Sequence, residues 1–128
     1  MAKESDIKKR VAVYQKYKGK CAYCGVKINY EDMHLDHITP KYRGSTNQEL
    51  AKYNIVKGKD SLENFNPSCC SCNCSKSTYT IENWKKELLL KHDRLLRDNS
   101  GYKIMHRFGM IKVKNEITFY FEKLNSKI

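Results

Sequence analysis

The sequence contains no long apolar run. No window approaches the roughly 20 consecutive apolar residues that a membrane-spanning helix needs. The opening segment, MAKESDIKKRVAVYQKYKGK, lacks the apolar core of a signal peptide. We therefore expect a cytoplasmic protein with no membrane partner. Repeats, low-complexity tracts and a clear domain boundary are also missing, so the 128 residues predict a single domain.

Acidic residues are outnumbered by basic residues. The chain has 14 Asp and Glu against 25 Lys and Arg, which gives a formal net charge of +11 and a pI of about 9.4. A protein this far from neutrality favours a polyanionic partner, and nucleic acid is the usual one. The composition therefore predicts a protein that binds or cuts a nucleic acid.

Helical periodicity marks two segments. Residues 5–18 predict a helix in which Ile7, Val11 and Tyr14 form a buried stripe. A stronger pattern runs from Thr80 to Asp98 and predicts an amphipathic helix. The apolar face of this second helix contains Ile81, Trp84, Leu88, Leu89, Leu95 and Leu96.

Alternating apolar residues predict short strands. One strand covers Met33–Ile38, and a hairpin covers Met110–Glu122 with its turn at Asn115. Residues 41–59 are polar and predict a long excursion with a helical turn near 48–53. Together with the helices, these strands predict an α+β protein.

Cysteine spacing gives the strongest signal of a metal site. Cys21 and Cys24 form one Cys-x-x-Cys pair, and Cys69 and Cys72 form another. In a reducing compartment, clustered cysteines are more often metal ligands than disulfides. Four thiolates in two such pairs match structural Zn²⁺, whereas buried or redox-active cysteines are the alternative. The cluster PSCCSCNCSKS also contains Cys70 and Cys74, for which we expect no ligand role.

A carboxylate and an imidazole are adjacent at the end of the first strand. Asp36 is suited to hold a hard cation while a neutral His37 takes a proton from water, which is the chemistry of metal-assisted hydrolysis. A surface His beside an Asp is also common. His34 lies on the same strand face as Asp36, so it either contacts the metal or substrate or is an ordinary exposed histidine.

Three motifs resemble, in order and spacing, a known family. CAYCG, LDHITP and SLENFNPSCCSCNCSK are similar to the zinc-stapled HNH endonucleases, over about residues 20–76. The resemblance implies a ββα-metal (HNH/His-Me finger) core with a structural four-cysteine zinc site at 20–79. An N-terminal helix at 1–19 would precede this core, and an extension at 80–128, a helix plus a β-hairpin, would follow it.

Site roles follow from the resemblance. It implies that Asp36 and Asn73 hold one catalytic Mg²⁺ or Mn²⁺ and that His37 is the general base. Asn64 would brace the loop that carries His37. Asn73 stands where many relatives have a histidine, and an amide oxygen favours a hard cation. Lys76 completes the motif, either as a phosphate contact or as a solvated helix residue.

The function implied is metal-dependent cleavage of DNA. The chain would be an endonuclease or nickase of phage, restriction or mobile-element type, acting on double-stranded DNA. Two cuts would need a homodimer or two successive nicks. The basic face of the 80–98 helix, with Lys85, Lys86 and Lys91, is either a DNA contact or simply solvated. A zinc-stapled DNA-binding module without catalysis and an RNA-directed nuclease are the alternatives.

Overall fold

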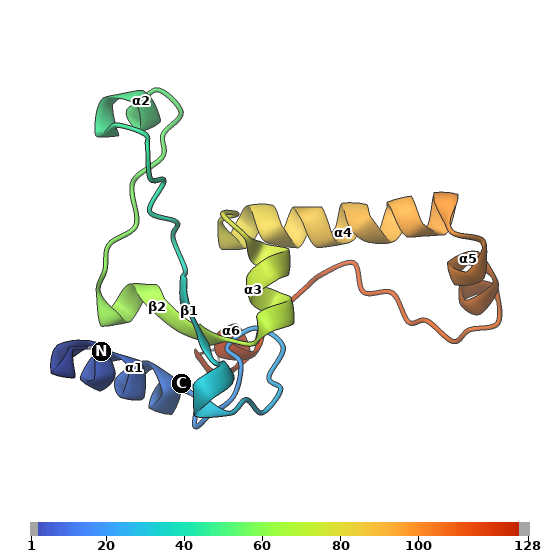
Figure 1. The fold of residues 1–128 in the computed structure, drawn as a ribbon. Helices are drawn as coiled ribbons and strands as arrows, with labels where there is room; N and C mark the ends of the chain where they lie inside the picture. Colours follow the sequence, from blue (N-terminus) through green and yellow to red (C-terminus); the bar gives the residue numbers. More distant parts are fainter. Residues whose placement is uncertain (1–2, 126–128) are drawn as a thin grey trace.

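The computed structural model describes residues 3–125, which form helices around one small sheet (Figure 1). Within this range no helix is long and apolar enough to cross a membrane. The elements follow in the order α1 (Glu4–Lys16), η1 (Tyr30–Asp32), β1 (His34–His37), α2 (Asn47–Ala51), η2 (Leu62–Asn64), β2 (Phe65–Ser68), α3 (Cys70–Lys76), α4 (Ile81–Asp98), α5 (Ser100–Arg107) and α6 (Tyr120–Asn125).

The sheet consists of β1 and β2 in antiparallel pairing. Its register puts Asp36 opposite Asn66 and His37 opposite Phe65. All four residues of β2 are buried, and α3 begins directly after that strand. The outer edge of β2 is also used, because the Ala22 N–H donates to the Pro67 carbonyl at 2.9 Å. This bond attaches the first Cys-x-x-Cys segment to the sheet.

Helix α1 packs on the sheet through its buried residue Val13, and Lys16 donates a hydrogen bond to the Phe65 carbonyl of β2 at 2.7 Å. Val13 is buried in a cluster with Ile28, Met33 and Phe65. The predicted stripe is wrong in detail, because Ile7 and Val11 are 48% and 38% exposed. A sheet of four-residue strands is too small to cover a 13-residue helix along its whole length.

Helix α4 matches the predicted amphipathic helix and anchors the second apolar cluster. Thr80 caps it by accepting a hydrogen bond from the Asn83 N–H at 3.2 Å. Trp84 is 2% exposed, stacks on Phe119 with 4.6 Å between ring centroids, and meets Tyr23 edge-on at 5.1 Å. Aromatic residues from distant parts of the chain therefore fix the start of α4.

The chain turns at Asn99 into a further helix that the sequence analysis did not predict. Asn99 ends α4 and also caps α5, because its side chain accepts a hydrogen bond from the Tyr102 N–H at 2.9 Å. Asn99 and Ser100 therefore act as a helix start as well as a stop. The two helices pack against each other at the far end of α4 (Figure 1).

The predicted C-terminal hairpin is wrong. No strand follows β2 in residues 69–125, and Tyr120–Asn125 is helix α6. An isolated hairpin is only marginally stable, and this segment has better partners elsewhere. The N–H groups of Tyr120 and Phe121 donate to the carbonyls of Tyr23 and Ala22 at 3.0 and 2.8 Å. The tail thus packs against the first Cys-x-x-Cys segment instead of pairing with itself.

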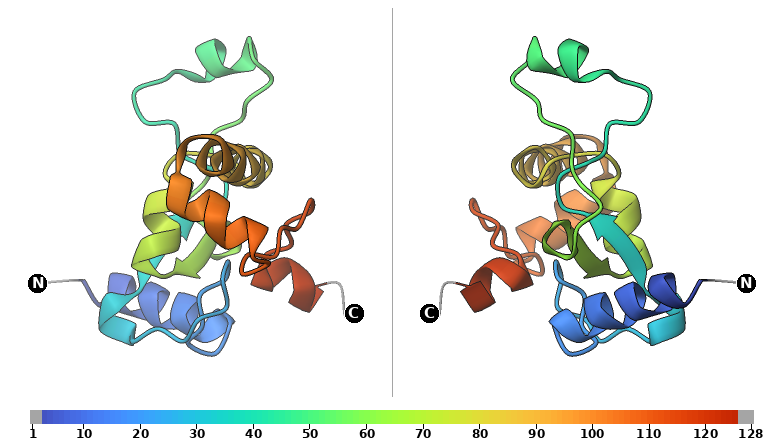
Figure 2. Two further views of the ribbon diagram at one scale, coloured as in Figure 1. Left: turned by 90° about the vertical axis from the view of Figure 1, so that its right-hand side faces the viewer. Right: turned by 90° about the vertical axis from the view of Figure 1, so that its left-hand side faces the viewer.

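Residues 41–59 project away from the sheet and carry α2 at their tip (Figures 1 and 2). Thr46 caps α2, as its side chain accepts from the Glu49 N–H at 3.1 Å. The predicted helical turn near 48–53 corresponds to this helix. We call residues 41–59 the projecting segment.

Candidate active site and cysteine cluster

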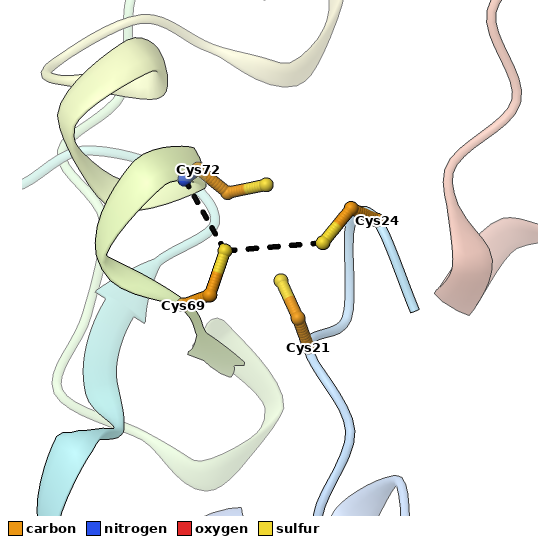
Figure 3. A group of neighbouring side chains, drawn as sticks. All are labelled: Cys21, Cys24, Cys69 and Cys72. Atoms are coloured by element: carbon orange, nitrogen blue, oxygen red, sulfur yellow. Dashed lines mark hydrogen bonds between the residues drawn. The ribbon is translucent and has the colours of Figure 1, made fainter. Parts of the chain in front are cut away.

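The four predicted ligand cysteines converge at one place (Figure 3). Their sulfur atoms all lie within 4.8 Å of one another, and the Cys24 and Cys69 sulfurs are 3.8 Å apart. Four sulfurs at this spacing can surround one tetrahedral metal ion such as zinc. The two remaining cysteines of the cluster, Cys70 and Cys74, are exposed on α3 and do not belong to this group.

Local backbone geometry presents these sulfurs. Gly25 has a φ of +78° and closes the turn after Cys24, which a residue without Cβ adopts most easily. Cys69 is the N-cap of α3, and its sulfur accepts a hydrogen bond from the Cys72 N–H at 3.4 Å. Two tight turns, one before the sheet and one after it, therefore face each other.

Hydrogen bonding within the cluster favours the thiolate form of Cys21 and the thiol form of Cys72. The Cys72 thiol donates a hydrogen bond to Cys21 and, with neighbouring backbone N–H groups, lowers the pKa of Cys21 to about 4. The same interaction raises the pKa of Cys72. Because thiolate is the form that binds metal, the four-cysteine cluster is compatible with a structural metal such as zinc.

Tyr23 connects the cysteine cluster to Asp36. It lies between Cys21 and Cys24, is 3% exposed, and donates its hydroxyl hydrogen to Asp36 Oδ2. Burial and the neighbouring Asp36 carboxylate raise the pKa of Tyr23, so the phenol stays a donor. The turn that presents two sulfurs thus also orients the carboxylate of the strand.

Lys76 is buried beneath the same carboxylate. Its ammonium lies 3.2 Å from Asp36 Oδ2 and donates to the His37 carbonyl at 2.8 Å. Since the Lys76 side chain is 0% exposed, the expectation of a phosphate contact or a solvated lysine is wrong: the last turn of α3 packs against β1. Burial raises the pKa of Asp36, while the Tyr23 hydroxyl and the Lys76 ammonium act in the opposite direction.

His37 is held through one ring nitrogen. Its Nε2 lies 2.8 Å from Asp60 Oδ1, and Lys41 Nζ lies 2.7 Å from Asp60 Oδ2. The hydrogen bonds from Lys41 and His37 lower the pKa of Asp60 to about 2, so the carboxylate can only accept. In this pairing Nε2 carries the hydrogen, and Nδ1 is the basic nitrogen of a neutral His37.

Asn64 ties together the chain on both sides of the projecting segment. Its Oδ1 accepts from the Thr39 N–H at 2.8 Å, and its Nδ2 donates to the carbonyls of Thr39 and Lys59 at 3.0 and 2.9 Å. The Asn64 carbonyl also accepts from the Ile38 N–H at 2.8 Å. These bonds hold the backbone immediately after His37.

A pocket of about 280 Å³ brings three of the four predicted catalytic residues together, and Asn64 lies outside it. Asp36, His37 and Asn73 all line it, and the root of the projecting segment completes the wall. Neither hydrogen-bonded contact of Asp36 uses Oδ1. A carboxylate oxygen and an amide oxygen form a donor set that suits a hard divalent cation. The residues lining the pocket are Leu35, Asp36, His37, Pro40, Lys41, Tyr42, Arg43, Asn73, Ser77 and Thr78.

The other candidate residues lie outside this pocket. His34 is exposed at the start of β1. Lys85 forms a 2.7 Å ion pair with Glu122. Lys86 and Lys91 are exposed on α4, and their DNA contact stays a prediction.

No role was predicted from the sequence for three residues that contact Asp36, His37 or their partners. Tyr23 sits inside the first Cys-x-x-Cys, where only the spacing of the cysteines attracts attention. Lys41 and Asp60 stand at the two ends of the polar excursion. Opposite charges flanking a long loop were the available signal, because ends that meet in space can form such a pair.

Comparisons with known proteins give a family likeness for the part of the chain that contains the pocket. Residues 21–79 match the family described as HNH endonuclease. Over these residues the chain is similar to the HNH endonucleases, which are a class of nuclease.

Two relatives illustrate the likeness. Over 68 residues the chain is 32% identical to the SPbeta prophage-derived protein YoqL of Bacillus subtilis (strain 168), named as a candidate HNH endonuclease. The crystal structure of the Type II-C Cas9 enzyme from Actinomyces naeslundii aligns with a TM-score of 0.52 and 25% identity. The alignment with the prophage protein covers 53% of this chain and 27% of that protein. The alignment with Cas9 covers 69% of this chain and 8% of the Cas9 chain.

Proposed function

We propose that the protein is a metal-dependent DNA endonuclease or nickase. The observation that carries this proposal is the pocket in which His37, oriented by Asp60, meets the oxygen ligands Asp36 and Asn73. The match of residues 21–79 to the HNH endonuclease family supports the reaction class. The order β1, β2, α3 around the pocket supports a ββα-metal core.

Two different metal sites are proposed. Cys21, Cys24, Cys69 and Cys72 would hold a structural Zn²⁺, since thiolates are its preferred ligands. Asp36 and Asn73 would hold Mg²⁺ or Mn²⁺, since their oxygens suit hard cations. A divalent cation at the second site would stabilise negative charge on the scissile phosphate and on the leaving oxygen.

Side chains in and near the pocket would then accept the proton, bind the phosphate and hold the loop in place. His37 Nδ1 would take the proton from the attacking water, because Nε2 is held by Asp60. Lys41 and Arg43 line the same pocket and supply positive charge where a phosphate would sit. Asn64 would keep the loop after His37 in place while these groups act.

DNA is the proposed substrate because of the charge of the protein. A net charge of +11 favours a polyanion, and double-stranded DNA is the form we propose. One pocket per chain would cut one strand at a time, so double-strand breaks would need a homodimer or two nicks. The prophage origin of one relative supports a phage or mobile-element setting.

One assay tests the proposal. The purified protein is incubated with supercoiled plasmid and with structured RNA, in Mg²⁺ and in EDTA. We expect nicked plasmid in Mg²⁺ only, and a loss of about 10²-fold or more for His37→Ala, the scale of general-base catalysis. Tight binding without cleavage would identify a DNA-binding module, and cleavage of RNA alone would identify an RNA-directed nuclease. Equal plasmid cleavage by His37→Ala would show that the base is assigned wrongly.

A further inference from the structure

The projecting segment is rich in basic residues. It contains five basic residues and one acidic residue: Lys41, Arg43, Lys52, Lys57 and Lys59 against Glu49. Tyr53 and Val56 are 75% and 76% exposed. Basic residues interleaved with exposed apolar side chains are typical of a surface that contacts phosphates and base edges together.

The root of the projecting segment is part of the catalytic pocket. Lys41, Tyr42 and Arg43 line that pocket with His37. A strand whose scissile phosphate sits there must therefore pass the first residues of the projecting segment. Of the remaining basic residues, Lys52 follows α2 at the tip, whereas Lys57 and Lys59 flank Gly58, whose N–H is bonded to the Pro40 carbonyl at the root.

The segment is firmly attached at its root. The Gly58 N–H donates to the Pro40 carbonyl at 2.8 Å. A Cβ on Gly58 would lie 1.8 Å from the Thr39 carbonyl oxygen, so only glycine allows the two ends of the segment to meet this closely. The Lys41 ion pair with Asp60 closes the same root at 2.7 Å. This attachment couples the position of the tip to the position of His37.

We propose that the projecting segment binds the duplex beside the scissile bond and thereby selects the position of the cut. Lys52 and Lys57 contact backbone phosphates, and Tyr53 and Val56 pack into the adjacent groove. The occupant is double-stranded DNA because the excess of basic residues complements its phosphates. This inference rests on the proposed nuclease function and adds the surface that holds the substrate.

The test compares two double variants. The tip variant Lys52→Gln/Tyr53→Ala removes one charge and one exposed ring. The control Lys8→Gln/Ile7→Ala removes one charge and one exposed apolar side chain from α1, at the opposite end of the molecule (Figure 1). Binding of a fluorescent duplex of about 30 base pairs, long enough to pass both the pocket and the tip, is measured in EDTA at several salt concentrations. Cleavage of the same duplex is then measured in Mg²⁺.

We expect the tip variant to bind about tenfold more weakly. The slope of log affinity against log salt should fall by about one, for one lost phosphate contact. KM should rise with kcat unchanged, the cleavage positions should broaden, and the control should behave as wild type. Unchanged affinity and cleavage positions in the tip variant would overturn the proposal. Val56→Ser provides a second test with a smaller change, and it should broaden the cleavage positions in the same way.

The two proposals fail differently. If wild type cuts the duplex and the tip variant is equal to it, the nuclease stands and the interface is wrong. If wild type binds without cutting and the tip variant binds weakly, the interface stands and the catalytic proposal is wrong. A change of oligomeric state in the tip variant at unchanged DNA affinity would overturn the interface in favour of a second copy of the chain.

Discussion

The imidazole of His37 is paired with the carboxylate of Asp60, with 2.8 Å between Nε2 and Oδ1. Asp60 follows the projecting segment and His37 precedes it, so the pair joins the two ends of the excursion. Lys41 binds the second carboxylate oxygen and keeps Asp60 ionised. An ionised carboxylate selects one tautomer of its histidine, which is the condition for a directed proton acceptor.

Asp60→Asn should lower kcat about 10- to 100-fold and change KM much less. An amide can rotate its NH₂ toward Nε2, and that favours the tautomer with hydrogen on Nδ1, where the proton from water must go. Steady-state kinetics measures kcat and KM, and imidazole ¹⁵N NMR reports the tautomer. Wild-type His37 should carry its hydrogen on Nε2, and the variant should populate the other tautomer.

Glu63→Gln is the matched control for this prediction. Glu63 is an exposed carboxylate close by on η2, and its removal should leave both kcat and the His37 spectrum unchanged. A normal tautomer together with normal kcat in Asp60→Asn would contradict a positioning role.

The cysteine cluster should bind one zinc ion per chain. Cys69→Ser removes one of the four converging sulfurs and should release the metal, because structural zinc needs four ligands. Cys70→Ser changes the adjacent exposed thiol and should retain it. Metal content by mass spectrometry gives the answer. Release of zinc by Cys70→Ser would mean that a different set of cysteines binds it.

Local patterns made several elements predictable. Helix α4 follows from the spacing of its apolar residues, and the two Cys-x-x-Cys pairs carry their geometry within a few residues. Asp36 and His37 are adjacent in the sequence, and both line one pocket at the end of β1. In each case the information lies within one helix or one turn.

The features that the sequence did not predict depend on tertiary contacts. The alternation in residues 110–122 suits a strand, but Phe119 finds a better partner in Trp84 than a hairpin would offer. A lysine near the end of a helix is usually solvated, so the sequence gives no sign that Lys76 is buried. Its burial results from the packing of α3 against Asp36 of β1. The partnership of His37 with Asp60 depends on the path of the projecting segment, for which no local pattern exists.

Lys76→Met should destabilise the protein by about 3–5 kcal/mol. The variant keeps the volume of the side chain but leaves Asp36 buried without its cation, and an unpaired buried charge is costly. Urea unfolding measures the effect. Lys86→Met on the exposed surface of α4 is the control and should change stability by less than about 0.5 kcal/mol.

The double variant Asp36→Asn/Lys76→Met separates charge from packing. Removing the unpaired carboxylate should restore part of the lost stability, since the penalty lies mainly in that charge. If Lys76→Met were as stable as Lys86→Met, the buried pair would make no contribution to folding.

Phe119→Ala should lower the free energy of unfolding by about 3–5 kcal/mol, because it leaves a cavity beside Trp84 and Tyr23. Phe108→Ala removes the same ring from a position that is 77% exposed, so its effect should stay below about 0.5 kcal/mol. Urea unfolding can be followed by the fluorescence of Trp84, which is the single tryptophan of the chain. Emission in folded Phe119→Ala should shift to the red as water reaches the indole. Equal stability of the two variants would mean that the tail does not close over α4.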